Sequence, residues 1–219
     1  MENTFARKSP LIGQELETQL KTLLSSLTLP VMLTCIADDR DRSMEMGAFL
    51  NHLVSLSPQL SCVFLSPGEK TEYEKAMDAD LLPATGIASP GALPRMVFHG
   101  IPGGKEISSF ASALLTAGGA AKPLDRYTLK DIMKIRRPMV LQTCVSLACR
   151  HCAQLAACTY RIAAENPQVT AHVTDANLYP ALVEKYNIQR VPLLIVDREN
   201  LYPGGKTMAE LTTLLSKLI

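Results

Sequence analysis

Tryptophan is absent from this 219-residue chain, and aromatic residues make up only 5% of it. No apolar run approaches the ~18 residues that span a bilayer. The formal net charge is +1, which argues against a bulk electrostatic partner such as nucleic acid or an anionic membrane. Six cysteines are too sparse for a secreted disulfide scaffold, and residues 1–8 lack the basic-then-apolar order of a signal peptide. We therefore expect a soluble cytoplasmic protein with one or two globular domains.

The most informative stretch is Thr143-Cys144-Val145-Ser146-Leu147-Ala148-Cys149-Arg150-His151-Cys152. An apolar run precedes it and a helical pattern over about 153–165 follows, so Cys149 is expected to open the helix. There, unpaired backbone N–H groups and the helix dipole would stabilise a thiolate on Cys149. Cys152, one turn later, could then close or resolve a disulfide. The pattern predicts a dithiol/disulfide switch in which Cys149 has a lowered pKa, assisted by Arg150 and by His151 when protonated.

The preceding part of the chain reads as alternating helices and strands. The expected elements are a helix over 11–28, a strand over 31–35, a helix over 43–56, a strand over 61–65, loops around a short helix near 72–77, a third strand over 95–99, a turn at 102–104 and a helix over 106–117. Gly118-Gly119 is expected to end that last helix.

The chain then repeats itself. Pro30-Val31-Met32-Leu33-Thr34-Cys35 is echoed by Pro138-Met139-Val140-Leu141-Gln142-Thr143-Cys144, and from Cys35 and Cys144 onward an offset of 109 holds for more than twenty positions. Later markers are Leu93-Pro94 against Val191-Pro192, and Pro102-Gly103-Gly104-Lys105 against Pro203-Gly204-Gly205-Lys206. The repeat predicts two copies of strand–helix–strand–(helix)–strand–hairpin–helix.

The first copy lacks the dithiol, because Arg40 and Ser43 stand in register with Cys149 and Cys152. Cys35, Cys62 and Cys158 are expected to be packing residues. The sequence supports a metal site around Cys149 and Cys152 less well than a redox dithiol. Cys144, Cys149 and Cys152 have the opening spacing of a plant-type iron–sulfur site but lack a distant fourth cysteine, and a zinc site within one turn lacks a second ligand pair.

These features resemble the thioredoxin/glutaredoxin-like pattern of a strand, a C-x-x-C motif opening a helix, and a later Val-Pro before a Gly-rich hairpin. Two such units with a dithiol only in the second resemble the N-terminal domain of the alkyl hydroperoxide reductase F subunit, over about residues 16–219. The resemblance implies an α/β protein of two tandem thioredoxin-like folds, which we expect to divide into residues 1–120 and 121–219. Tandem protein disulfide oxidoreductases are also similar, but they commonly carry a dithiol in each unit.

The resemblance also implies roles for individual residues. Cys149 matches the attacking cysteine, Cys152 the resolving cysteine, and Pro192 the cis-proline that faces the dithiol. By repeat logic, Pro94 is a candidate for a second cis-proline. Glu106 matches an acidic residue that lies near the dithiol across the repeat interface, although a first-turn glutamate is also ordinary helix chemistry.

In that family, the domain passes electrons from a flavin-dependent disulfide reductase, separate or fused, to a peroxiredoxin disulfide. The chain lacks the G-x-G-x-x-G spacing of a dinucleotide site, so no bound cofactor is expected. No metal is expected either, because the cysteine spacings do not complete a metal site. The chain is then either a free-standing carrier or a fragment of a longer protein. Two alternatives stay open: a redox-inactive docking module, and a general protein disulfide reductase or isomerase.

Overall fold

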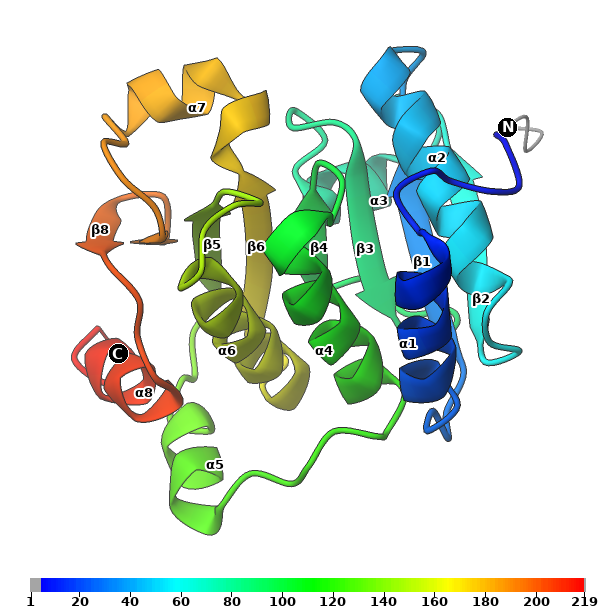
Figure 1. Cartoon of the computed structure of the whole chain (residues 1–219). Coiled ribbons are helices and arrows are strands. Elements are labelled where there is room, and N and C mark those ends of the chain that lie inside the picture. The colour runs from blue at the N-terminus through cyan, green and yellow to red at the C-terminus, as the bar shows by residue number, and fades with distance from the viewer. Residues whose placement is uncertain (1–4, 219) are drawn as a thin grey trace.

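A computed structural model describes residues 5–218, which contain a single eight-stranded sheet (Figure 1). The strand order is β2-β1-β3-β4-β6-β5-β7-β8, so each half of the chain contributes four adjacent strands. Within each half, the first two strands pair in parallel and the last two form an antiparallel hairpin. The two predicted copies are therefore confirmed, and they share one sheet. No helix in residues 5–218 is long and apolar enough to cross a bilayer.

The elements of the two copies follow the same order along the chain. The first copy contains α1 (Gln14–Leu24), β1 (Val31–Ile36), α2 (Asp41–Val54), β2 (Leu60–Leu65), α3 (Thr71–Met77), β3 (Ala84–Ala88), β4 (Met96–His99), the 3-10 helix η1 (Gly104–Glu106) and α4 (Ile107–Ala117). The second contains α5 (Arg126–Ile132), β5 (Met139–Val145), α6 (Cys152–Glu165), β6 (Val169–Asp175), the 3-10 helix η2 (Ala176–Leu178), α7 (Pro180–Lys185), β7 (Leu193–Val196), β8 (Asn200–Pro203) and α8 (Met208–Leu215).

The sheet is covered on both faces, but unequally. One large apolar cluster includes Leu24 of α1, Phe49 of α2, Phe110 of α4 and Leu155 of α6, and it runs across both copies. The other face carries two smaller clusters, one per copy, beneath α3 and α7. The helices α4 and α6 lie side by side over the centre of the sheet, one from each copy (Figure 1).

The two copies join where β4 and β6 pair in parallel, with Met96 opposite Ala171 and His99 opposite Thr174. Tyr160 of α6 is 1% exposed and donates a hydrogen bond from its hydroxyl to Val97 O of β4, 3.1 Å away. The junction is thus a continuous part of the hydrophobic core rather than a flexible contact between separate units.

Two elements differ from the sequence-based prediction. The stretch expected to be loops between Pro67 and Pro90 contains β3, which pairs with β1 and β4, so the strand expected third is the fourth. The helix α5 was not predicted at all, although Asp125 caps it by accepting hydrogen bonds from the backbone N–H groups of Tyr127 and Thr128. The short β3 strand holds Gly86, and small residues buried on both faces give no alternating pattern to detect.

A pair of buried histidines lies at the junction. His99 Nε2 is 3.0 Å from His172 Nδ1, and His99 Nδ1 is 2.8 Å from Leu81 O. A carbonyl oxygen only accepts, so His99 carries its proton on Nδ1 and accepts a hydrogen bond at Nε2 from His172. Burial lowers the pKa of both imidazoles, and the proximity of His99 lowers the pKa of His172 further. Both are therefore held neutral.

These histidines should make the fold sensitive to acid. Below pH ~6.5 the unfolded chain binds protons at both histidines, whereas the folded chain resists doing so. The free energy of unfolding therefore decreases as the pH is lowered. We expect a His99→Gln/His172→Gln variant to lose less stability than the wild type between pH 7.5 and 5.5, as measured by urea unfolding. His151→Gln, at an exposed position, is the matched control. Equal losses in the double variant and the wild type would contradict this interpretation.

Candidate active site

The dithiol lies where β5 ends, at the carboxyl edge of the parallel β5–β6 pair, which is a common place for sites in α/β folds. Cys149 and Cys152 are joined by a disulfide, and their Cα atoms are 5.5 Å apart. Cys149 is partly exposed, whereas Cys152 is completely buried. Of the two sulfur-bearing residues, only Cys149 therefore presents surface to the solvent.

The helix start differs from the prediction. Cys149 lies in a turn, in which its N–H donates to Ser146 O at 2.9 Å, and α6 begins at Cys152 with His151 as its N-cap residue. The chain makes a second turn at Arg150 and His151 before it becomes helical. The unpaired N–H groups at the start of α6 thus begin at Cys152, and Cys149 precedes the helix by three residues.

The loop that carries Pro192 faces Cys149. The Val191–Pro192 peptide bond is cis, as predicted, and Val191 O is 3.9 Å from Cys149 Sγ. A depression beside this loop is lined by His151, Gln154, Val191, Pro192, Gly204, Gly205, Lys206, Thr207 and Glu210.

The prediction of a cis bond at Pro94 is wrong, because the second cis peptide bond in residues 5–218 is Leu82–Pro83. Pro83 and Pro192 differ by the same offset of 109 that relates the cysteines to Arg40 and Ser43. The extra residues of the first copy lie later, in the 89–95 loop of the β3–β4 hairpin. Pro94 belongs to that loop and packs against Gly86, where a Cβ atom would overlap it.

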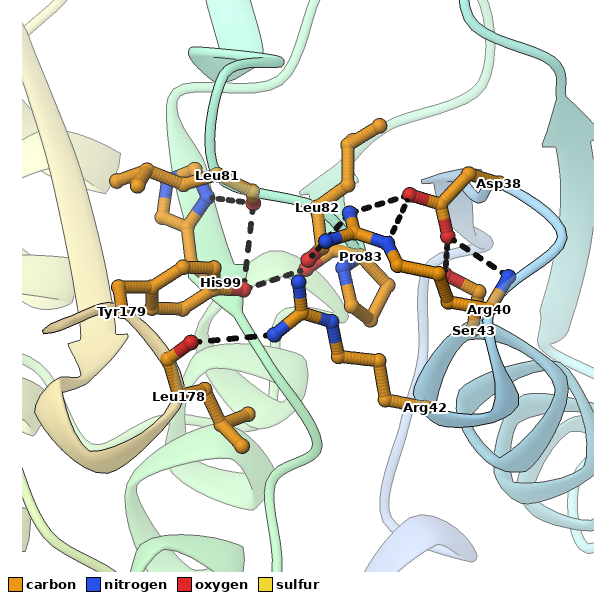
Figure 2. Close-up of polar contacts among 10 residues, drawn as sticks. All are labelled: Asp38, Arg40, Arg42, Ser43, Leu81, Leu82, Pro83, His99, Leu178 and Tyr179. Atoms are coloured by element: carbon orange, nitrogen blue, oxygen red, sulfur yellow. Dashed lines mark hydrogen bonds and ion pairs between the residues drawn. The ribbon is translucent and has the colours of Figure 1, made fainter. Parts of the chain in front are cut away.

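The first copy therefore retains the arrangement of the site without its sulfurs (Figure 2). Arg40, which corresponds to Cys149, donates a hydrogen bond to Leu82 O at 3.4 Å. Leu82 corresponds to Val191, whose carbonyl oxygen lies close to Cys149 in the second copy. Ser43, in register with Cys152, is also fully buried and donates to Asp38 Oδ1 at 2.6 Å. The unchanged offset of 109 was the sequence signal that could have identified Leu82–Pro83.

Glu106 is fully buried at the interface of η1 with α6. Its Oε2 accepts a 2.6 Å hydrogen bond from Ser109, while Oε1 has no partner among the described residues. Desolvation raises the pKa of Glu106 to about 7, and the negative charge of Asp175 adds to the rise. A carboxyl group that titrates near neutrality at this interface can change charge under ordinary conditions.

The first copy also contacts the dithiol turn through its backbone. Lys105 N–H donates to Leu147 O at 2.8 Å. Gly104 adopts φ +53°, and a Cβ atom there would overlap the Leu147 carbonyl oxygen. Glycine is needed at this position for both its conformation and the close approach.

The other cysteines are poor nucleophiles. Burial raises the pKa of Cys35 and of Cys144 to about 12, and it raises the pKa of Cys62 and Cys158 as well. All four are free thiols, and their high pKa values disfavour the reactive thiolate. In the part of the chain that is described, no group of three or more His, Cys, Asp or Glu residues is arranged to hold a metal ion.

Comparisons with known proteins bear on this geometry. The thioredoxin-domain family model matches residues 139–216, which extend from β5 through α8 of the second copy. The N-terminal (NTD_N/C) domain of alkylhydroperoxide reductase from Enterococcus faecalis superposes with a TM-score of 0.88 at 28% identity, covering 93% of this chain and 99% of that chain. This chain is thus similar over nearly its whole length to the N-terminal domain of the alkyl hydroperoxide reductase F subunit.

The F subunit of the Pseudomonas aeruginosa alkyl hydroperoxide reductase is 27% identical over 201 residues, covering 92% of this chain and 36% of that protein. A Bacillus subtilis protein described as an NADH dehydrogenase is 25% identical over 201 residues, covering 92% of this chain and 37% of its own. This chain thus spans about a third of the length of the curated relatives it matches. A protein disulfide oxidoreductase from Aeropyrum pernix shares the fold, with a TM-score of 0.83 at 14% identity over 94% of this chain and 93% of that one.

Proposed function

We propose that the protein is a thiol–disulfide oxidoreductase that passes electron pairs to a partner protein disulfide, which we take to be that of a peroxiredoxin. The observation that carries the proposal is the pairing of a partly exposed Cys149 with a buried Cys152 against the cis-Pro192 loop. The relationship to the alkyl hydroperoxide reductases supports the choice of partner.

In the reducing direction, the Cys149 thiolate attacks one sulfur of the partner disulfide, and the other partner sulfur leaves as a thiolate. Cys152 then loses its proton and attacks Cys149 Sγ. The Cys149–Cys152 bond forms as the mixed disulfide breaks, and the partner leaves with both sulfurs reduced. A dithiol of a flavin-dependent reductase, fused or separate, returns two electrons to the pair by the reverse exchange. This chain needs no cofactor of its own for these steps.

Two further residues take part in the proposed mechanism. Pro192 shapes the surface on which the partner backbone lies, since the carbonyl before it approaches Cys149. Glu106 acts across the interface between the copies by changing charge near pH 7, which its raised pKa supports. We also propose that the units divide at residues 120 and 121, just beyond the Gly118-Gly119 end of α4, and that the protein is cytoplasmic.

Reduction of insulin disulfides by dithiothreitol separates this function from a docking module. We expect the protein to accelerate insulin precipitation and Cys149→Ser to leave it at the uncatalysed rate. A redox-inactive docking module would not change the rate in either form, and that result would overturn the proposal.

His151 should tune the reactivity of Cys149. It is exposed at the start of α6, and its protonated form favours a thiolate on the neighbouring sulfur. We expect alkylation of reduced wild-type Cys149 by iodoacetamide to have a pH midpoint below the ~8.5 of a free thiol, and His151→Ala to raise that midpoint. The pair should also become more reducing, because a less stabilised thiolate favours the disulfide. A wild-type midpoint near ~8.5 that His151→Ala leaves unchanged would contradict an activated thiolate.

A further inference from the structure

The cis-proline loop of the first copy is already occupied. In the second copy, the loop that carries Pro192 lines an open depression. In the first copy, the backbone carbonyls around Pro83 instead accept hydrogen bonds from side chains of this same protein. Leu81 O and Pro83 O each lie 3.4 Å from the hydroxyl of Tyr179, and Leu82 O accepts from Arg40. Figure 2 shows the tyrosine reaching this loop from the second copy.

Leu178, the residue before Tyr179, is also held in place by the first copy. Arg42, in the first turn of α2, donates to Leu178 O at 3.1 Å, and its guanidinium lies 5.6 Å from the centre of the Tyr179 ring (Figure 2). Leu178 also packs on Gly100, where a Cβ atom would come within 2.9 Å of its Cδ1 atom. Tyr179 is 6% exposed. The first copy thus holds residues 178–179 by hydrogen bonds, a cation–π contact and close packing.

The segment held in this way contacts the dithiol turn. Asn177 Nδ2 donates to Ser146 Oγ at 3.1 Å, and the Asn177 backbone N–H donates to Asp175 Oδ1 at 3.2 Å. Ser146 O is the acceptor for Cys149 N–H. A short chain of contacts therefore runs from Arg42 through residues 177–179 to Ser146, separate from the Lys105–Leu147 bond to the same turn.

We propose that the inactive site of the first copy is an internal docking site for residues 177–179, and that Arg42 and Tyr179 are positioning residues for the dithiol turn. An anion is a poorer occupant of this site, because Asp38 is ion-paired with Arg40, and Asp39 and Asp41 flank it in the sequence. The inference rests on the proposed thiol–disulfide chemistry. It assigns the first copy the task of holding Cys149 and Cys152 close together when they are reduced.

The equilibrium with glutathione measures this task. The reduced dithiol and glutathione disulfide give the Cys149–Cys152 disulfide and two glutathione thiols, so two electrons and two protons pass to glutathione. When the contacts fix the dithiol turn, the two reduced sulfurs stay near each other, and formation of the Cys149–Cys152 disulfide is favoured. When the contacts are lost, the reduced form gains more conformational freedom than the disulfide form, and the equilibrium shifts toward the reduced form. Loss of one contact in the chain should lower the equilibrium constant roughly fivefold, the factor that one hydrogen bond typically supplies.

We expect this fall in Arg42→Met, which keeps the length of the side chain without its donors, and in Asn177→Ala. The double variant should fall little further, because both changes break one chain of contacts. Tyr179→Phe removes only a hydroxyl group, so it keeps the test valid should Arg42→Met fold poorly, and it should shift the constant in the same direction. Arg137→Met is the matched control, since Arg137 also donates to a backbone carbonyl, that of Leu218, but within the second copy.

A constant within twofold of the wild type in Asn177→Ala and in Tyr179→Phe would overturn the inference, whatever their melting temperatures, and would leave the proposed function intact. A wild-type protein that does not exchange with glutathione at all would overturn both.

Discussion

Replacing Cys149 by serine is expected to reduce disulfide exchange to the uncatalysed rate. Cys149 is the partly exposed sulfur of the pair, and it lies 3.9 Å from the carbonyl of the residue before cis-Pro192. Cys152 has no exposed surface from which to replace it as the first nucleophile. The measurement is the rate of insulin reduction. Counting the free thiols of the variant establishes that its remaining cysteines are intact.

Cys152→Ser should behave differently from Cys149→Ser. Cys149 can still attack, but nothing resolves the mixed disulfide, so one partner molecule should be trapped per protein and be visible by mass spectrometry without reductant. Cys158→Ser is the matched control on the same helix, where burial raises the thiol pKa, and it should retain turnover. Loss of activity in Cys35→Ser comparable to that of Cys149→Ser would mean that the first copy has been misinterpreted.

Glu106→Gln is expected to stabilise the protein by an amount that grows as the pH rises above about 4.5. Burial raises the folded-state pKa from an ordinary 4.5 to about 7, so ionisation of Glu106 costs the fold stability as the pH rises between these values. Above pH 7 the full cost is about 3 kcal/mol, and glutamine, which stays neutral, avoids it. The gain should therefore be largest near pH 8 and vanish near pH 4.5 in urea unfolding.

Glu210→Gln is the matched control for this measurement. Glu210 accepts hydrogen bonds from Thr207 that lower its pKa, so removing its charge should give no gain at pH 8. A Glu106→Gln variant whose stability relative to the wild type does not change with pH would contradict the buried, titrating carboxyl group.

The same variant tests the link between Glu106 and the dithiol. A carboxylate that forms near pH 7 opposes a nearby thiolate, and the two titrations then overlap. Glu106→Gln should lower the alkylation midpoint of Cys149 and sharpen its titration. An unchanged midpoint would remove only the effect of Glu106 across the interface and leave the exchange mechanism in place.

The sequence was most informative where chemistry and spacing coincide. The Cys149/Cys152 spacing after a buried strand located the site, and the offset of 109 located the repeat and its missing dithiol. The family resemblance, rather than the spacing itself, predicted a cis-proline at Pro192, and the peptide bond before it is cis. The cysteine spacing and the repeated segments are patterns in the residues themselves, so the sequence shows them without any knowledge of tertiary contacts.

The errors have physical causes of a different kind. The strand β3 is only five residues long and contains Gly86, whose lack of a side chain leaves room for Pro94. The helix α6 begins at Cys152 because the residues before it form successive turns, whose geometry depends on contacts with Lys105 and Asn177. Contacts between the copies, such as Arg42 with Leu178, join residues more than a hundred positions apart and leave no local pattern.

Transfer of electrons to a peroxiredoxin tests the central claim most directly. The reduced protein is mixed with an oxidised peroxiredoxin, quenched with acid at intervals and alkylated, and both proteins are counted by mass spectrometry. We expect the peroxiredoxin disulfide to disappear at the same rate as the Cys149–Cys152 disulfide forms, one for one, and neither to change in Cys149→Ser. A peroxiredoxin that stays oxidised while glutathione disulfide oxidises the same dithiol would contradict the account.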